Sequence, residues 1–187
     1  MQGSARRHRA RPEPEVLIRA ATVSDIPALH ALVESAYRGD SARSGWTHEA
    51  DLLGGQRTDR TMLAAMLAGQ RTALLVAEVD GVLIGCVAAE DRDTHGYVSM
   101  VTVSPSEQGS GLGRTLLGAA ERQVRESFGR TRARMSVISL RTELIGWYRR
   151  RGYRDSGETA PFPYGDSRFG EPVRDDLAFV ILEKPLD

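Results

Sequence analysis

The chain has 187 residues, of which 41% are hydrophobic, enough for one globular domain with its own core. Its 25 basic and 25 acidic side chains cancel, so no overall field favours a nucleic acid or a membrane surface as partner. No apolar run approaches the roughly 18 residues of a membrane-spanning helix, and the single cysteine, Cys86, rules out an intrachain disulfide.

Residues 1–15 carry four arginines and two prolines but no apolar segment. They predict a disordered basic tail and not a secretory signal. The tail is either simply solvated or an arm for nucleic acid, and we favour the solvated tail. Because Cys86 falls in an apolar strand pattern, we expect a buried, inert thiol and a cytoplasmic protein.

Hydrophobic periodicity predicts strands and helices from residue 16 onward. The first half predicts a strand over 16–19, helices over 26–36 and 60–68, and strands over 73–79, 82–89 and 97–103. Asp59 suits the cap of the second helix, and Asp80-Gly81 is typical of a two-residue hairpin. Residues 37–57 show no clear period.

The second half predicts a helix over 112–127, a strand over 132–138, a helix over 142–151, a strand over 153–158, a loop over 160–176 and a strand over 177–183. The element order is thus β-α-α-β-β-β-α-β-α-β-β. This order indicates an α/β (α+β) fold with a mixed sheet, in one domain over residues 16–187.

One stretch, from Val101 to Leu117, reads V-T-V-S-P-S-E-Q-G-S-G-L-G-R-T-L-L. Pro105 ends the strand because it has no N–H to donate. The glycines allow a tight turn and close approach of a ligand, and the first N–H groups of the following helix have no partner within it. Together these features predict a socket for a phosphate or pyrophosphate.

The glycine spacing fits neither a P-loop, whose lysine is missing, nor the G-x-G-x-x-G of a Rossmann-type nucleotide-binding protein. The pattern Q-x-x-G-x-G from Gln108 to Gly113 instead resembles the pyrophosphate loop of the GNAT superfamily of acetyl-CoA-dependent N-acetyltransferases. The segment from Val137 to Tyr153, V-I-S-L-R-T-E-L-I-G-W-Y-R-R-R-G-Y, is similar to a second motif of that superfamily. The element order is similar to the GNAT fold, a mostly antiparallel sheet flanked by helices.

The resemblance implies how acetyl-CoA is bound. The backbone of Val101, Thr102 and Val103 would pair with the pantetheine arm and face the acetyl carbonyl. The loop amides would hold the pyrophosphate, and they belong to Gln108, Gly109, Ser110, Gly111, Leu112, Gly113 and Arg114. Arg141 stands where the family commonly has an asparagine, and either reaches the phosphates of CoA or is a solvated arginine at a helix start.

The resemblance also makes Tyr148 the acid that protonates the departing thiolate, although an ordinary core tyrosine fits the same pattern. An alkyl ammonium has a pKa of roughly 10.4, so the acceptor amine has to lose a proton before it attacks. Our choice of base is Glu90, at the end of the strand beside the acyl strand. His95 and Glu143 are alternatives, and Ser99 would hold a water in a relay.

The acceptor site is expected between the segments 37–57 and 160–176, which wall it in the family. Trp46 and Glu49 lie close in the first segment and suggest an acidic aromatic patch that attracts an ammonium group. The alternative is that Trp46 plugs the core and that the acids cap a helix.

The sequence therefore predicts an enzyme that moves an acetyl group from acetyl-CoA to a primary amine of a small molecule, amino acid or peptide. Attack is direct, without a metal or a covalent enzyme intermediate. The alternative is a non-catalytic acyl-CoA-binding or regulatory module on the same fold. The assembly is left open between a monomer and a homodimer.

Overall fold

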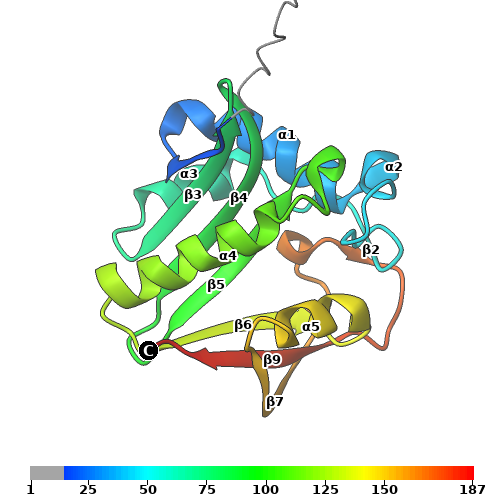
Figure 1. The fold of residues 1–187 in the computed structure, drawn as a ribbon. Coiled ribbons are helices and arrows are strands. Elements are labelled where there is room, and N and C mark those ends of the chain that lie inside the picture. Colours follow the sequence, from blue (N-terminus) through cyan, green and yellow to red (C-terminus); the bar gives the residue numbers. More distant parts are fainter. Residues whose placement is uncertain (1–14) are drawn as a thin grey trace, which may run out of the picture.

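A seven-stranded sheet forms the centre of the molecule in the computed structural model, which describes residues 15–187 (Figure 1). The strand order is β1-β3-β4-β5-β6-β9-β7. The strands of this sheet are β1 (Leu17–Ala20), β3 (Thr72–Val79), β4 (Val82–Asp91), β5 (Gly96–Val103), β6 (Arg132–Ile138), β7 (Arg154–Pro161) and β9 (Ala178–Pro185). The predicted tail over residues 1–15 lies outside the described residues, apart from Glu15.

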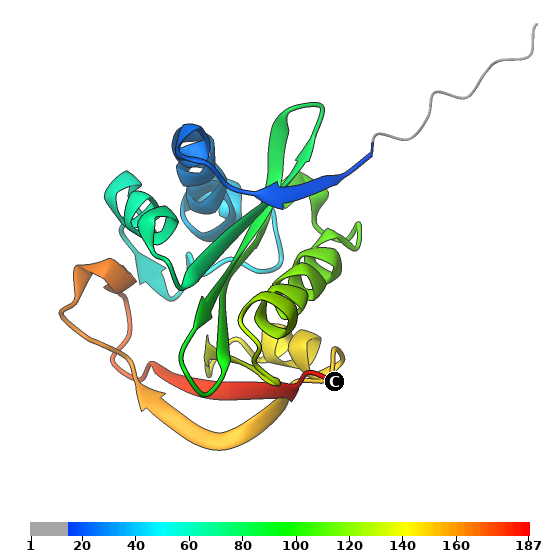
Figure 2. The ribbon, with the colours of Figure 1, turned by 90° about the vertical axis from the view of Figure 1, so that its left-hand side faces the viewer.

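The helices cover both faces of the sheet (Figure 2). They are α1 (Ile26–Tyr37), α2 (Gly39–Ala42), α3 (Arg60–Ala68), α4 (Leu112–Arg122) and α5 (Thr142–Arg149). The apolar sides of α1 and α3 pack on one face, and those of α4 and α5 pack on the other. A π-helical turn over Gln123–Ser127 extends α4. No helix among residues 15–187 is long and apolar enough to cross a membrane.

The sheet divides into two halves between β5 and β6. These two strands are parallel and pair only at Gly96↔Ala133 and Tyr97↔Arg134, whereas every other neighbouring pair in this sheet is antiparallel. Beyond Tyr97 they diverge, so the C-terminal half of β5 has no neighbour on that side (Figure 1). A groove between two strands of one sheet is a natural place for an extended ligand.

Local signals in the sequence explain most of these elements. The Asp59 carboxylate caps α3 by accepting from the amide of Met62 at 2.7 Å. Asp80 and Gly81 both have positive φ angles, 50° and 79°, as a type I′ hairpin turn between β3 and β4 requires. The predicted mixed, mostly antiparallel sheet and its element order are confirmed.

The structure contains short helices and strands in two segments for which the sequence predicts no secondary structure, residues 37–57 and 160–176. The segment after α1 contains α2 and β2 (Leu53–Gly54), and the predicted loop 160–176 contains β8 (Glu171–Pro172). β2 and β8 pair with each other as a separate antiparallel ribbon. A strand of two residues has no alternation to detect, so its partner in space, and not its sequence, defines it.

Candidate active site

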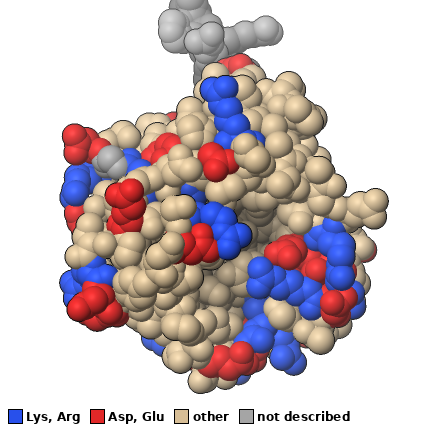
Figure 3. Space-filling view, turned by 180° about the vertical axis from the view of Figure 1, so that it is seen from behind, with Lys and Arg blue, Asp and Glu red and all other residues tan. Residues whose placement is uncertain are grey.

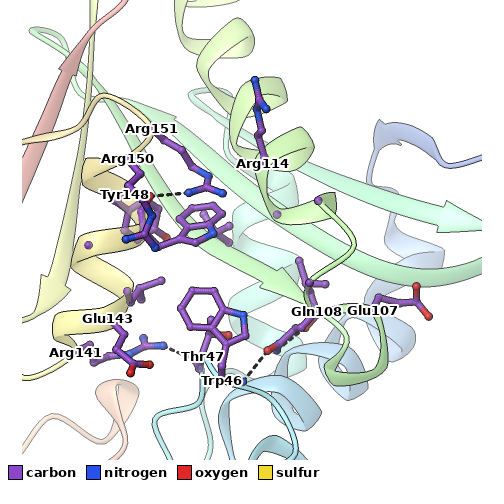
Figure 4. A pocket seen from close by; sticks show the side chains of 18 of the residues that line it. Trp46, Thr47, Glu107, Gln108, Arg114, Arg141, Glu143, Tyr148, Arg150 and Arg151 are labelled. Carbon is purple, nitrogen blue, oxygen red and sulfur yellow. Dashed lines mark hydrogen bonds between the residues drawn. The ribbon is translucent and has the colours of Figure 1, made fainter.

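A cleft of about 660 Å³ lies beside the C-terminal half of β5, where β6 has diverged from β5 (Figure 4). Val101 and Val103 of β5 form its floor, the loop before α4 forms one wall, and α5 forms the other. Tyr37, Trp46 and Thr47, from the end of α1 and the segment after it, also line the cleft. The cleft therefore joins parts of the chain that lie far apart in the sequence.

A β-bulge shapes the floor. The pairing of β4 with β5 passes from Cys86↔Thr102 to Ala88↔Ser99, so one residue of β4 faces two of β5. Met100, within the bulge, has a φ of 51°, in the left-handed region that a residue with a Cβ rarely adopts. A bulge interrupts the ladder and leaves backbone groups of the bulged strand without a strand partner.

The three strand residues expected to meet the cofactor divide between two sides of β5. Val101 and Val103 line the cleft, whereas Thr102 is 1% exposed and its hydroxyl donates to the Met100 carbonyl oxygen at 3.0 Å. The Tyr37 hydroxyl donates to the carbonyl oxygen of Val101 at 2.8 Å. The side chain of Thr102 thus lies in the core, which leaves only its backbone for a role in the cleft.

The glycine loop presents free amides. Gly109 and Gly111 have φ angles of 91° and 93°, and α4 begins immediately afterwards at Leu112. Within residues 15–187, the amides of Gly109, Gly111 and Gly113 donate to no other protein atom. Amides of this kind at the start of a helix attract an anion, because the helix dipole is positive there. The predicted phosphate socket therefore has the donors that it needs.

Two residues of the loop lie away from the cleft, and a third, Gln108, contacts neighbouring segments through its side chain. Ser110 and Leu112 face a neighbouring groove on the outer side of the loop. Gln108 accepts from the amide of Trp46 at 2.9 Å and donates to the carbonyl oxygen of Val103 at 3.3 Å. Its side chain thus ties the loop to β5 and to the segment after α1.

Three arginines lie toward one end of the cleft, and Trp46 and Thr47 lie toward the other (Figure 4). Neither Arg114 nor Arg150 forms an ion pair with a carboxylate among the described residues. Arg151 stacks 3.5 Å from the ring centroid of Trp147, and burial, followed by repulsion from Arg150 and Arg114, lowers its pKa. Such unpaired cations suit a polyanion that carries several phosphates.

Tyr148 lies in the same cleft as the glycine loop. Its ring packs edge-on against Trp147 and Tyr153, with centroids 5.0 and 5.8 Å away, and only 6% of the residue is exposed. Burial, assisted by the nearby Tyr37, raises the pKa of its hydroxyl well above the ordinary range. The hydroxyl is therefore protonated at neutral pH, and it donates to no other described residue.

The predicted acidic patch for an ammonium group is wrong at Glu49. Trp46 lines the cleft with 43% of its surface exposed, but Glu49 is 7% exposed and does not line it. The carboxylate of Glu49 accepts from Arg38 at 2.7 Å and from Arg141 at 2.8 Å, and the Nε atom of Arg57 is 3.8 Å away. Its charge is therefore neutralised inside the protein.

The predicted solvated position of Arg141 is wrong as well. The residue lines the cleft, but its side chain is only 10% exposed and its guanidinium is bound to Glu49 and to the carbonyl oxygen of Thr47 (Figure 4). It is therefore not a solvated arginine, and its bonds to Glu49 and Thr47 direct its guanidinium to the protein itself. It fastens the start of α5 to the segment after α1.

Glu90 does not reach the cleft. It pairs with Tyr97 in the β4–β5 register, six residues before Val103, which corresponds to roughly 20 Å along the strand. Its carboxylate is 44% exposed and bound to Arg92 at 3.1 Å. His95 and Ser99 do not line the cleft either, and Glu143 is the one base candidate that does.

The sequence analysis missed several lining residues, namely Tyr37, Thr47, Trp147, Arg150 and Arg151. The last three are spaced i, i+3 and i+4, so helical periodicity puts them on one side of the predicted helix 142–151, although α5 itself ends at Arg149 and the two arginines lie in the turn that follows. Tyr37 and Thr47 had no such signal. No group of three or more metal-ligating side chains occurs within residues 15–187.

Comparisons with known proteins agree with this geometry. Residues 29–153 match the sequence model of the acetyltransferase (GNAT) family. An IAA acetyltransferase from Azospirillum brasilense is 31% identical over 128 residues, which cover 64% of this chain and 72% of that protein.

Solved structures share the fold. The ribosomal-protein-S18-alanine N-acetyltransferase from Escherichia coli superposes with a TM-score of 0.67 at 15% identity, covering 92% of this chain and 95% of that one. The yncA protein from Salmonella typhimurium, solved with its cofactor acetyl-CoA, gives a TM-score of 0.67 at 21% identity, with the same coverage of 92% and 95%.

Proposed function

The chain belongs to the acetyltransferase (GNAT) family, whose members use acetyl-CoA, and on that premise we propose that it acetylates a primary amine of a small molecule, amino acid or peptide. The observation that carries the proposal is the pairing of unoccupied loop amides with Tyr148 in one cleft. The amides suit the phosphates of the cofactor, and the hydroxyl suits its leaving thiolate.

The residues of the cleft fit acetyl-CoA by their chemistry. The amides of Gly109, Gly111 and Gly113 would hold the pyrophosphate, with Arg114 and Arg150 supplying positive charge beside it. Backbone groups of β5 released by the bulge would pair with the amide groups of the pantetheine arm. When bound, acetyl-CoA supplies an acetyl thioester.

Three groups of this chain would act on the reacting atoms. The N–H groups of β5 beside the bulge would stabilise negative charge on the acetyl oxygen. The Tyr148 hydroxyl would donate its proton to the thiolate sulfur, and its raised pKa keeps that proton available at neutral pH. Glu143, on the rim of the cleft, would take the proton from the amine directly or through water.

Thiol release measured with acetyl-CoA and a library of amines tests the proposal. We expect acetyl-CoA to raise the melting temperature of the protein, because it binds the native state, and at least one amine to release CoA. Tyr148→Phe should lower kcat by about 10²- to 10⁴-fold, the usual range for a general acid, and leave the stabilisation by acetyl-CoA intact. Stabilisation without thiol release by any amine would instead support the non-catalytic alternative.

A further inference from the structure

A cluster of arginines and carboxylates lies beside the Tyr37 end of the cleft, and Arg141 is the member that lines the cleft itself. Arg38, Arg57 and Arg141 surround the single carboxylate of Glu49. Glu34 is also near, and its carboxylate accepts from the amides of Arg57 and Thr58 at 2.7 and 2.9 Å. Three guanidinium groups and two carboxylates give this cluster a net charge of +1, and the carboxylate of Glu143, which lines the cleft itself, balances it.

This charge is next to the reacting strand. The Tyr37 ring lies between two of the arginines, with the guanidinium carbon of Arg57 at 5.3 Å and that of Arg141 at 5.9 Å from its centroid. The hydroxyl of the same tyrosine is bonded to Val101 in the bulged part of β5. An acceptor that reaches the acetyl group past Tyr37 therefore passes close to two guanidinium groups, which would attract a carboxylate.

Arg57 differs from its two neighbours in exposing its unpaired donors to the surface, whereas the unpaired Nε and Nη2 atoms of Arg38 are buried. Arg38 and Arg141 each donate to Glu49 and to a backbone carbonyl, and their side chains are 6% and 10% exposed. The side chain of Arg57 is 27% exposed, and neither of its Nη atoms has a hydrogen-bond partner within residues 15–187. Two parallel N–H groups of this kind match a carboxylate.

On the premise of the proposed function, we propose that the acceptor is an amine that carries a carboxylate, and that Arg57 binds this carboxylate. The phosphates of the cofactor would occupy the Arg114 and Arg150 end, so the acceptor approaches from the side of Tyr37. The face behind that of Figure 1 is hollowed near its middle, with acidic and basic side chains interspersed around the hollow (Figure 3).

Matched acceptors test this inference by the release of CoA thiol. The panel pairs amino acids, ω-amino acids and dipeptides with their carboxamides, which keep the amine and lose the charge. We expect kcat/KM to be at least about 10-fold higher for the carboxylates. Removing the carboxylate charge lowers the pKa of the amine, which by itself favours the amide, so amine basicity cannot produce this preference.

Variants of two nearby arginines test whether Arg57 causes the preference for acceptors with a carboxylate. Arg57→Gln should raise KM for the carboxylates by about 10- to 100-fold and change KM for the amides by no more than about twofold. Arg57→Lys should recover part of the lost affinity for the carboxylates. Arg60→Gln is the control, because Arg60 is exposed and makes no ion pair or side-chain hydrogen bond among the described residues. If kcat/KM for the amides equals or exceeds that for the carboxylates, or if Arg60→Gln raises KM for the carboxylates as much as Arg57→Gln does, this inference is overturned while the proposed function stands. Absence of thiol release with every amine would overturn the proposed function and this inference with it.

Discussion

Replacing Glu49 with glutamine would leave two buried arginines without a counter-ion. Among the described residues, Glu49 is the one carboxylate in ion-pair contact with Arg38 and with Arg141, and the three side chains are 9%, 6% and 10% exposed. Breaking a buried ion pair by removing one partner costs about 3–5 kcal/mol, because the remaining charge stays desolvated. In a domain of this size that cost corresponds to a fall in Tm of about 6–20 °C.

The effect should depend on pH in a defined direction. Burial by itself would raise the pKa of Glu49, but the attraction of Arg141, Arg57 and Arg38 is larger in sum and holds it below the ordinary value of 4.5. A carboxyl whose pKa is lowered by folding contributes stability above its unfolded pKa and loses that contribution as pH falls through the folded value. The difference in Tm between the wild type and Glu49→Gln should therefore be constant from about pH 6 to 8 and shrink below about pH 4.5.

Thermal unfolding of the ligand-free protein, followed by tryptophan fluorescence, measures both effects. Asp51→Asn is the matched control, because Asp51 is in the same segment and pairs with Arg43, but its side chain is 61% exposed. An exposed ion pair contributes about 0–1 kcal/mol, so this variant should lose less than about 4 °C. Equal shifts in the two variants would refute the claim that burial makes the Glu49 cluster important.

Three further predictions follow from the cleft and the core. Arg150→Gln, combined with Arg114→Gln, should raise KM for acetyl-CoA by about 10-fold or more with little change in kcat, and the loss should shrink at high salt; an unchanged KM would contradict the phosphate role. Burial raises the pKa of the Cys86 thiol to about 11, so iodoacetamide at pH 8 should label Cys86 only after unfolding, as mass spectrometry would show. Gly111→Ala should destabilise the protein by about 1 kcal/mol because its φ is 93°, whereas Gly118→Ala, inside α4 with open space around a new Cβ, should stabilise it by up to about 1 kcal/mol in urea titrations.

Features that depend on neighbours in the sequence were predictable. The Asp80-Gly81 turn, the Asp59 cap and the glycine loop before α4 each act within a few residues, so their chemistry is visible in the order of amino acids. The same holds for Tyr148, whose spacing from Leu144 and Ile145 follows the helical period of α5. Two-residue strands and the lining role of Tyr37 had no such local signal.

The sequence by itself determined the element order and the glycine loop before α4, because hydrophobic periodicity and short-range backbone preferences control them, and its motifs carried the family resemblance. Only the tertiary structure decided which charged side chains are neutralised by a partner within the protein and which remain available to a ligand. Glu49 and Arg141 are 92 positions apart, yet they neutralise each other at 2.8 Å, while Glu90 lies at the far end of the sheet from the cleft. An electrostatic role depends on the sum of all nearby charges and on burial, and both are fixed by contacts between segments that are distant in the chain.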